Sequence, residues 1–365
     1  MAPLISEKRV LVAISGGVDS SVAAAILKRK GFKVIGVFLK FWQPSFPRGK
    51  QVENICCSEQ ALFSARQLAE KLDIPFYIFD ASSIFKKTVV DYFISEYKAG
   101  RTPNPCMMCN KFVKFGWLID QAKKLGAQFV ATGHHARIKL NKKTGFFELF
   151  RGKDRKKDQS YFLWMLSQKQ LAHILFPIGN YTKAEVRKMA KKWSLPTGER
   201  KESQGICFIP DRDVPQFLKR YIRKLKKPGP IKDLKGNVLG THQGLAFYTI
   251  GQRQRIGIGG RKGKKGPLYV IALDIKTNSL IVGEDKDCFS KELLAEKVNW
   301  IVPVSSSFKC EAQIRYGHLP EKAKINRLNS EVKVEFFKKV RAITPGQAVV
   351  FYQGDKLLGG GIIKS

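Results

Sequence analysis

The chain is poor in acidic residues relative to basic ones. It has 30 Asp and Glu against 66 Lys and Arg among 365 residues, a formal net charge of +36. Such an excess favours a polyanionic partner, with nucleic acid first and an anionic membrane surface second. A proteome whose proteins are basic throughout would give the same composition, and charge does not distinguish DNA from RNA.

Long hydrophobic runs, repeats and low-complexity segments are also missing. No apolar run approaches the length that crosses a bilayer, so we expect no membrane partner. The first 14 residues lack the apolar core and cleavage site of a signal peptide. We therefore expect a cytoplasmic protein, or one in an equivalent reducing compartment. There, the seven cysteines are expected to be catalytic, metal-binding or inert rather than paired in structural disulfides.

The most informative motif is the serine- and glycine-rich string SGGVDSS at residues 15–21. It follows an apolar run expected to form a buried strand and leads into a small-residue stretch expected to form a helix. A strand, a glycine turn and a helix start direct several backbone N–H groups at one anion. Gly16 and Gly17 let the backbone approach a phosphate, the serine hydroxyls add donors, and Asp19 can hold Mg²⁺. The string is not the lysine-containing P-loop, because no lysine follows the glycines.

This string resembles the loop of the ATP pyrophosphatases that adenylate their substrates. Those enzymes split ATP between the α and β phosphates, pass AMP to a carbonyl oxygen and let a nucleophile displace the AMP. GMP, NAD and argininosuccinate synthetases and several tRNA-sulfurating enzymes are similar here. The resemblance implies ATP and Mg²⁺ without naming the acceptor.

Strands and helices alternate up to about residue 135, which predicts an α/β fold with a doubly wound parallel sheet, adenine nucleotide α-hydrolase-like. Strands are expected at 9–14, 34–41, 76–79 and 129–132, and helices at 22–30, 58–72, 88–97 and 110–125. Further on, the sequence predicts a hairpin turn at 142–145, a capping box of Thr182 with Glu185, a basic helix at 214–227 and short strands from 297. We expect a catalytic domain over 1–212, a small middle domain over 213–284 and a C-terminal β-barrel over 285–365.

Two further segments contain cysteines in expected loops. In RTPNPCMMCN at 101–110, two prolines argue against a helix through the segment. Cys109 is therefore expected where a loop meets a helix start, a position that favours the thiolate. The pair Cys106 and Cys109 is alone also compatible with half a zinc site or a redox pair. Cys207, in GICFIP, is alone equally compatible with a small buried hydrophobe.

Together these segments resemble one family, the tRNA-specific 2-thiouridylases, which replace the C2 oxygen of the wobble uridine of certain tRNAs with sulfur. The resemblance runs through nearly the whole chain. It is carried by CCS at 56–58, TPNP at 102–105, ATGH at 131–134, KDQSYFL at 157–163, GICFIP at 205–210, GQR at 251–253, RY at 315–316 and PGQ at 345–347.

The resemblance implies a role for each matching residue. Cys109 would be the nucleophile and Cys207 the carrier of a persulfide, with Asp19 as a third catalytic residue. ATP would be held by Ala13, Ile14, Ser15, Gly16, Gly17, Val18, Asp19, Ser20, Leu39 and Gly133. The target base would face Asn104, Pro105 and Cys106. The rest of the tRNA would be contacted by His134, Lys157, Asp158, Gln159, Arg315, Tyr316 and Gln347. Singly, each could equally be a structural residue.

The implied reaction transfers AMP to the C2 oxygen, which makes it a good leaving group. A persulfide on Cys207 then supplies sulfur to C2 directly, or releases hydrosulfide that does so. Cys109 closes a disulfide with Cys207 that a reductant must reopen. We expect the wobble nucleotide to be flipped out, and the middle helix and barrel to hold the anticodon stem through its phosphates. The implied partners are tRNA and a sulfur-donor protein, and the chain is expected to be a monomer.

Cys106 departs from the family, since many members have an acidic residue there. Cys106, Cys109 and Cys207 could ligate a [4Fe–4S] cluster with one iron open for sulfide, or a zinc ion. We favour the persulfide route, because sequence spacing does not decide ligation. A lesser departure is His135, where an aromatic residue is usual. Two other functions stay open. A synthetase acting on a small molecule would give the two thiols no use, and a tRNA-binding protein without catalysis would tolerate a broken phosphate loop.

Overall fold

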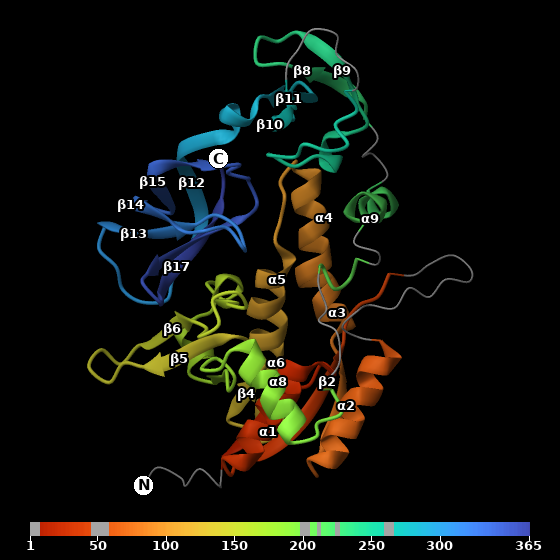
Figure 1. Ribbon diagram of the computed structural model, residues 1–365, viewed down its shortest axis with the longest axis vertical. Coiled ribbons are helices and arrows are strands. Elements are labelled where there is room, and N and C mark those ends of the chain that lie inside the picture. Colours follow the sequence, from red (N-terminus) through yellow and green to blue (C-terminus); the bar gives the residue numbers. More distant parts are fainter. Residues whose placement is uncertain (1–7, 45–57, 198–204, 210–212, 223–226, 259–265) are drawn as a thin grey trace.

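The computed structural model describes residues 8–44, 58–197, 205–209, 213–222, 227–258 and 266–365 (Figure 1). Its first domain contains a five-stranded, fully parallel sheet in the order β3-β2-β1-β4-β7. The strands are β1 (Arg9–Ala13), β2 (Lys33–Lys40), β3 (Phe76–Asp80), β4 (Phe129–Ala131) and β7 (Ile174–Leu175). The predicted doubly wound parallel sheet is confirmed.

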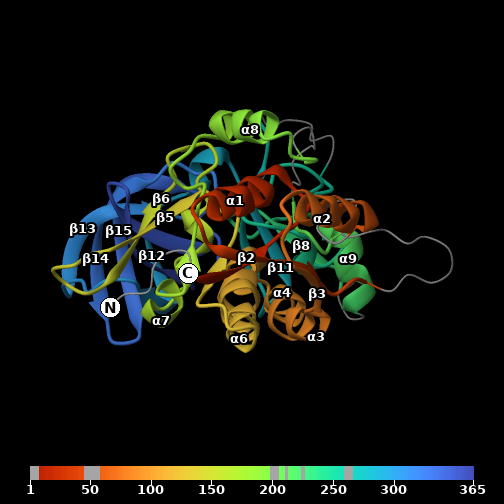
Figure 2. The same cartoon turned by 90° about the horizontal axis from the view of Figure 1, so that it is seen from below.

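Helices cover both faces of this sheet (Figure 2). One face carries α1 (Val18–Arg29), α2 (Glu59–Lys71) and α8 (Lys183–Lys192), and the other carries α3 (Ser82–Phe85), α4 (Asp91–Lys98) and α6 (Leu118–Lys124). The alternation of strand side chains accounts for the two layers. In β1, Val10 and Val12 pack in the core with α1, while Leu11 packs with α6. The predicted capping box of Thr182 and Glu185 is present at the start of α8.

The segment 105–124 forms one continuous helix, made of α5 (Pro105–Met108), a wider π-helical part η3 (Cys109–Trp117) and α6. Asn104 caps it, because its Oδ1 accepts a hydrogen bond from the Cys106 N–H at 3.1 Å. Pro105 occupies the first helical position, where the missing N–H costs nothing and the fixed φ suits the helix. The prediction that Cys109 lies at a loop–helix junction was therefore wrong: Cys106 is in the first turn and Cys109 lies one turn inside.

A similar composite helix precedes it, formed by α3, a π-helical turn η2 (Lys86–Val90) and α4. In the wide turns of η3, some carbonyl oxygens accept hydrogen bonds from a side chain outside the helix. The Gln170 side chain donates to the carbonyl oxygens of Lys111 at 2.9 Å and of Phe115 at 2.7 Å. Gln170 belongs to the short helix α7 (Gln168–Leu171), so α7 braces the helix that carries both cysteines.

The next helix is α9 (Val214–Tyr221), shorter than the predicted basic helix, part of which lies outside the described residues. Its Phe217 and Leu218 pack with Phe85 and Phe93 of the first domain. A four-stranded sheet follows in the order β10-β11-β8-β9. Its strands are β8 (Gly229–Lys232), β9 (Val238–His242), β10 (Tyr269–Asp274) and β11 (Ser279–Gly283). They enclose a small core of Ile231, Val270, Leu280 and Val282. This sheet lies at one end of the elongated molecule (Figure 1).

The C-terminal domain is the predicted β-barrel. It consists of β12 (Phe289–Trp300), β13 (Ser307–Gln313), β14 (Glu321–Leu328), β15 (Glu331–Arg341), β16 (Ala348–Gln353) and β17 (Lys356–Ile363), and pairing of β12 with β17 closes it. The predicted hairpin of β5 (Ala136–Leu140) and β6 (Phe147–Arg151) extends the same sheet, because β6 pairs with β17. A continuous hydrophobic cluster runs from Leu11 in the parallel sheet to Phe351 in the barrel. The hairpin and this shared core hold the barrel against the first domain.

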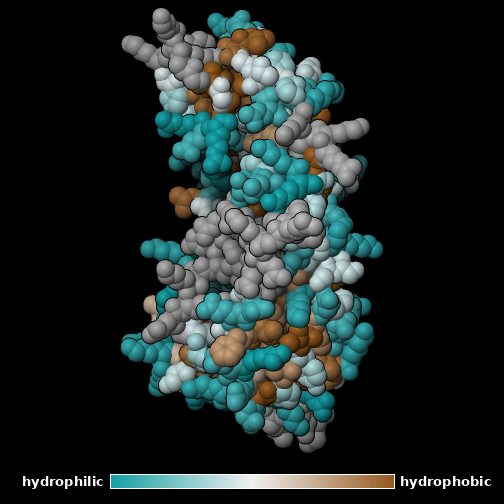
Figure 3. Space-filling model, turned by 90° about the vertical axis from the view of Figure 1, so that its right-hand side faces the viewer, coloured by the Kyte–Doolittle hydropathy of each residue, from teal (hydrophilic) through white to brown (hydrophobic). Residues whose placement is uncertain are grey.

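Three 3₁₀ turns complete the described elements: η4 (Ser160–Phe162), η6 (Leu245–Phe247) and η7 (Asp285–Cys288). Within the described residues, no helix is both long and apolar enough to cross a membrane. On the face in Figure 3 the coloured side chains are largely hydrophilic, and hydrophobic ones form smaller groups at the upper end and in the lower half.

Candidate active site

A cavity of about 760 Å³ opens at the carboxyl ends of β1, β2 and β4. The chain turns from β1 toward β2 and β3 on one side and later places β4 on the other, so β1 and β4 form a topological switch point. Doubly wound sheets bind their ligands at such points. The helix that starts at Pro105, the loops at 132–135 and 156–162, and the barrel residues Tyr316 and Gln347 complete the walls.

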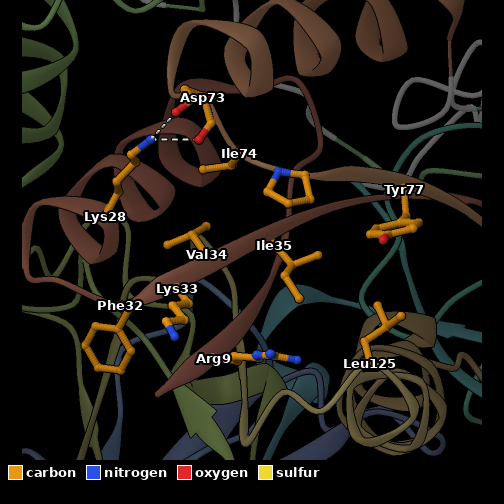
Figure 4. Close-up of a pocket in the computed structure, with 11 residues that line it drawn as sticks. Arg9, Lys28, Phe32, Lys33, Val34, Ile35, Asp73, Ile74, Tyr77 and Leu125 are labelled. Carbon is orange, nitrogen blue, oxygen red and sulfur yellow. Dashed lines mark hydrogen bonds and ion pairs between the residues drawn. The ribbon is translucent and has the colours of Figure 1, made fainter. Parts of the chain in front are cut away.

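A second cavity, of about 460 Å³, lies at the opposite ends of the same strands (Figure 4). Its lining includes Arg9 and Lys33, the first residues of β1 and β2, and the exposed ring of Tyr77. Lys28 closes one side by donating a hydrogen bond to the backbone oxygen of Asp73 at 2.7 Å. No predicted site residue lines this cavity. The candidate site is therefore the larger cavity, which most of the predicted site residues line.

The predicted ATP-binding residues other than Gly16 line the larger cavity. Gly16 has a φ of 69°, which a side chain disfavours, and turns the chain into α1. Gly17 is the N-cap of α1, so no capping side chain covers the first N–H groups of that helix. The hydroxyls of Ser20 and Ser21 donate to the Gly17 carbonyl oxygen at 3.0 and 2.9 Å, so these two serines stabilise the loop itself. The result is a helix N-terminus open to an anion.

Asp19 lies in the first turn of α1 and forms an ion pair across the cavity wall. Lys183 Nζ lies 2.8 Å from Asp19 Oδ1 and 2.7 Å from Oδ2. His135 Nε2 lies 3.4 Å from Asp19 Oδ1. Burial alone raises the pKa of Asp19, but the interactions with His135 and Lys183 outweigh burial and leave this pKa below its ordinary value. Asp19 is therefore a carboxylate at neutral pH.

Mg²⁺ suits this arrangement, because it is commonly bound through one or two carboxylates together with substrate phosphates. Asp19 supplies one such carboxylate beside the open N-terminus of α1. In the part of the chain that the structure describes, no three Cys, His, Asp or Glu side chains gather closely enough to hold a metal ion. The positions of the described cysteines therefore lend no support to the [4Fe–4S] or zinc alternatives.

His134 is buried at the back of the cavity between aromatic rings. Its ring centroid lies 5.7 Å from that of Phe115 and 5.6 Å from that of Phe176. Its Nδ1 is 2.7 Å from the Thr132 hydroxyl. Burial, and then the charge of Lys114, lower the pKa of His134 well below its ordinary value. The ring is neutral at pH 7, so any contact it makes with RNA uses hydrogen bonding or stacking rather than charge.

The three residues predicted to face the target base all lie on the cavity wall: Asn104, Pro105 and Cys106. Of the predicted tRNA contacts, Lys157, Gln159, Tyr316 and Gln347 also line the cavity with His134. The ring of Tyr316 is 45% exposed and packs on Phe162 with 4.5 Å between centroids. This pair forms an aromatic surface at the mouth of the cavity, of the kind on which nucleobases stack.

Two predicted tRNA contacts, Asp158 and Arg315, do not line the cavity. Asp158 is buried, and its carboxylate accepts hydrogen bonds from the Gly152 N–H at 3.0 Å and the Ser160 hydroxyl at 2.9 Å. It also pairs with Arg151 at 3.3 Å. Asp158 therefore holds the loop that presents Lys157 and Gln159, and direct contact with tRNA would require breaking these bonds.

Cys109 and Cys207 belong to one hydrophobic cluster, which also contains Phe85 and Phe208. Cys109 is buried and Cys207 is half-buried, while Cys106 is exposed. The residues just before Cys207, Gly205 and Ile206, line the same cavity as the phosphate loop. The chain therefore brings the segments carrying both thiols to the edge of the predicted ATP site.

The residues of the wall that sequence reasoning missed include Lys114, Lys156, Phe162 and Lys183. Lys183 was detectable only as the residue after the N-cap of a predicted helix. Its partner Asp19 is 164 positions away in the chain, and no local pattern links the two.

Known families and proteins match nearly the whole length of the chain. Three family descriptions match consecutive parts of the chain: the tRNA methyl transferase HUP domain over residues 8–211, the tRNA methyl transferase PRC-barrel domain over 215–284 and the aminomethyltransferase beta-barrel domain over 290–363. The tRNA-specific 2-thiouridylase MnmA of Carboxydothermus hydrogenoformans is 46% identical over 364 residues, covering 99% of each chain. MnmA 1 of Caldanaerobacter subterraneus subsp. tengcongensis is 46% identical over 98% of each chain.

A solved 4-thiouridine synthetase bound to RNA and ATP is more distant. It is 17% identical, with a TM-score of 0.34, over 59% of this chain and 50% of the other. This similarity is too low to indicate function.

Proposed function

Because this chain belongs to the family of tRNA-specific 2-thiouridylases, we propose that it converts the wobble uridine of tRNA to 2-thiouridine at the expense of ATP. The observation that carries the proposal is the shared cavity. One space is lined by the open N-terminus of α1, the Asn104–Cys106 segment and the residues preceding Cys207.

Adenylation comes first. The C2 oxygen of the uracil attacks the α-phosphorus of ATP, the bond between the α-phosphorus and the bridging oxygen breaks, and pyrophosphate leaves. The N–H groups at the start of α1, which no side chain caps, face the phosphates. Asp19 would hold Mg²⁺, which would supply further stabilisation of the phosphate charge. Asn104, Pro105 and Cys106 position the flipped base, whose extraction from the stack lets C2 reach the phosphate.

Sulfur transfer follows. The terminal sulfur of a Cys207 persulfide attacks C2, and AMP departs with the oxygen. The Cys109 thiolate then attacks the Cys207 sulfur. The sulfur–sulfur bond breaks with its electron pair passing to the sulfur on C2, which yields 2-thiouridine and a Cys109–Cys207 disulfide. An external dithiol reduces that disulfide before the next cycle. The placement of both cysteines in one cluster supports this pairing.

The three regions divide the work. We assign ATP chemistry to residues 1–212 and tRNA binding to 213–284 and 285–365. Tyr316, Gln347 and Lys157 contact RNA from the cavity rim, while Asp158 acts through the loop that it holds. A sulfur-donor protein that reloads Cys207 and a cytoplasmic location complete the proposal.

Cys207→Ala tests the separation of the two steps. We expect tRNA-stimulated pyrophosphate release to persist while formation of 2-thiouridine is lost, because only the second step uses the thiol. Cys310→Ala is the matched control. Cys310 lies in the barrel sheet, and burial raises the pKa of its thiol to about 12, so both steps should be unchanged. Absence of pyrophosphate release with any tRNA would instead favour a tRNA-binding protein without catalysis.

The cluster alternative is tested in an anaerobic preparation, by assaying iron and acid-labile sulfide alongside thiolation. A colourless, iron-free and active enzyme supports the persulfide route. Activity that depends on iron, together with the visible absorption of an iron–sulfur protein, would replace it.

A further inference from the structure

The phosphate loop has no lysine of its own, yet a lysine from elsewhere in the chain lies against it. Lys183 is the first residue of α8, lines the cavity and is only 8% exposed. Val186 and Ala190 of α8 pack in the same core as the apolar residues of α1. The packing of α8 on α1 therefore brings Lys183 beside the residues that begin α1.

Two sets of hydrogen bonds fix the backbone at Lys183. The preceding residue, Thr182, caps α8 in a reciprocal capping box with Glu185. The Lys183 N–H donates to Asp154 Oδ2 at 2.9 Å. The side chain then reaches both carboxylate oxygens of Asp19, at 2.8 and 2.7 Å. A buried ammonium needs such a partner, because removing an unpaired charge from water is costly.

His135 gives this pair an unusual neighbour. It is 2% exposed, and its Nε2 lies 3.4 Å from Asp19 Oδ1. Apart from this contact, neither of its ring nitrogens has a hydrogen-bond partner among the described residues. A polar ring with spare hydrogen-bonding capacity can keep Asp19 partnered when Lys183 moves away.

We propose that Lys183 is the phosphate-binding lysine of this site. Before ATP binds, its ammonium neutralises Asp19, which would otherwise repel the phosphates from the start of α1. When ATP binds with Mg²⁺, the ammonium transfers to the oxygens of the pyrophosphate moiety, and Asp19 becomes available to the metal. The identity of the nucleotide rests on the proposed function, whereas the lysine–phosphate contact does not.

The test measures equilibrium binding of inorganic pyrophosphate in EDTA, where no metal contributes. Lys183→Met should weaken binding about 10- to 100-fold, the range expected for one charge-assisted hydrogen bond. Asp19→Asn should strengthen it, because Lys183 is then released to the ligand. The double variant should lose that gain. Adenosine, which has no phosphate, should bind all four proteins equally.

Lys188→Met is the matched control, because Lys188 is an exposed residue of the same helix and should leave binding unchanged. If the double variant binds pyrophosphate as tightly as Asp19→Asn, Lys183 only neutralises Asp19, and the proposal is overturned. Equal loss of pyrophosphate and adenosine binding, with a lower unfolding temperature, would show that the Lys183–Asp19 ion pair only stabilises the fold. None of these measurements involves tRNA, so the proposal stands or falls separately from 2-thiouridine formation.

Discussion

Gly133 is the residue that allows two walls of the cavity to pack closely against each other. It follows β4 and packs directly on the start of α1. A Cβ at this position would lie 2.5 Å from the Ser20 nitrogen and 2.6 Å from the Asp19 carbonyl carbon. Both are backbone atoms, so they cannot turn aside as a flexible side chain could. The missing side chain lets the loop after β4 and the phosphate loop form adjacent walls of one site.

Gly133→Ala should therefore separate these two walls. We expect the free energy of unfolding to fall by about 1–3 kcal/mol, as for other overpacked sites, and the affinity for ATP to fall with it. Gly240→Ala is the control, because a Cβ there meets its nearest neighbours at an ordinary 3.8 Å. Urea unfolding and equilibrium ATP binding measure both effects. Wild-type ATP affinity in Gly133→Ala would show that the loop after β4 can move without harm.

At the scale of elements, the helix that begins at Pro105 decides where the two nearby cysteines lie. Its first turn places Cys106 on the cavity wall. The next turn directs Cys109 into the hydrophobic cluster that also contains Cys207. One helix therefore supplies Cys106 to the cavity wall and Cys109 to the hydrophobic cluster. Its starting point is held by Asn104, whose side chain is also predicted to face the target base.

Substitution of Asn104 can separate capping from base recognition. Asn104→Ala should lower the free energy of unfolding by about 1 kcal/mol, because the cap to Cys106 N–H is lost. Asn104→Ser should retain that stability, since serine caps helices about as well as asparagine. We expect both variants to lose 2-thiouridine formation. Full thiolation by Asn104→Ser would show that Asn104 is a cap and nothing more.

At the scale of the whole molecule, all three domains meet at residues 101–102. Thr102 N–H donates to the Pro345 carbonyl oxygen at 2.9 Å, and Gln347 Nε2 donates to the Thr102 oxygen at 2.8 Å. The Thr102 hydroxyl lies 3.3 Å from the Thr249 hydroxyl in the middle domain. Because Asn104 is two residues further on, the barrel and the middle domain jointly position the segment that is predicted to face the target base.

Arg101 ties the same junction through charge. It pairs with the buried Glu96 of α4 and, at 3.3 Å, with Glu296 of the barrel strand β12. Arg101→Met should cost about 3–5 kcal/mol, because Glu96 would remain buried without its cation. Adding Glu96→Gln should recover part of that loss. Lys364→Met, which removes the more exposed pair with Glu331, should cost no more than about 1 kcal/mol. Equal costs for Arg101→Met and the double variant in urea unfolding would contradict this account.

The sequence alone determined the features that depend on neighbouring residues. Strand and helix periodicity, the glycine turn before α1 and the capping box of α8 are local patterns, and each is present in the structure. Most of the residues assigned by family resemblance also lie on one cavity. The local patterns follow from short-range backbone geometry and side-chain alternation, which a linear chain displays directly.

Only the tertiary structure decided which distant groups meet. It started the helix at Pro105, joined the β5–β6 hairpin to the barrel through β17, buried Asp158 under its own loop and set Lys183 against Asp19. The joining of the hairpin to the barrel and the meeting of Lys183 with Asp19 depend on packing between elements far apart in the chain. A proline is as compatible with the first position of a helix as with a loop. The side chain of a lysine that follows a helix cap can extend into solvent as readily as it can pair with a carboxylate. Because burial and charge pairing choose between such alternatives, only the folded arrangement reveals them.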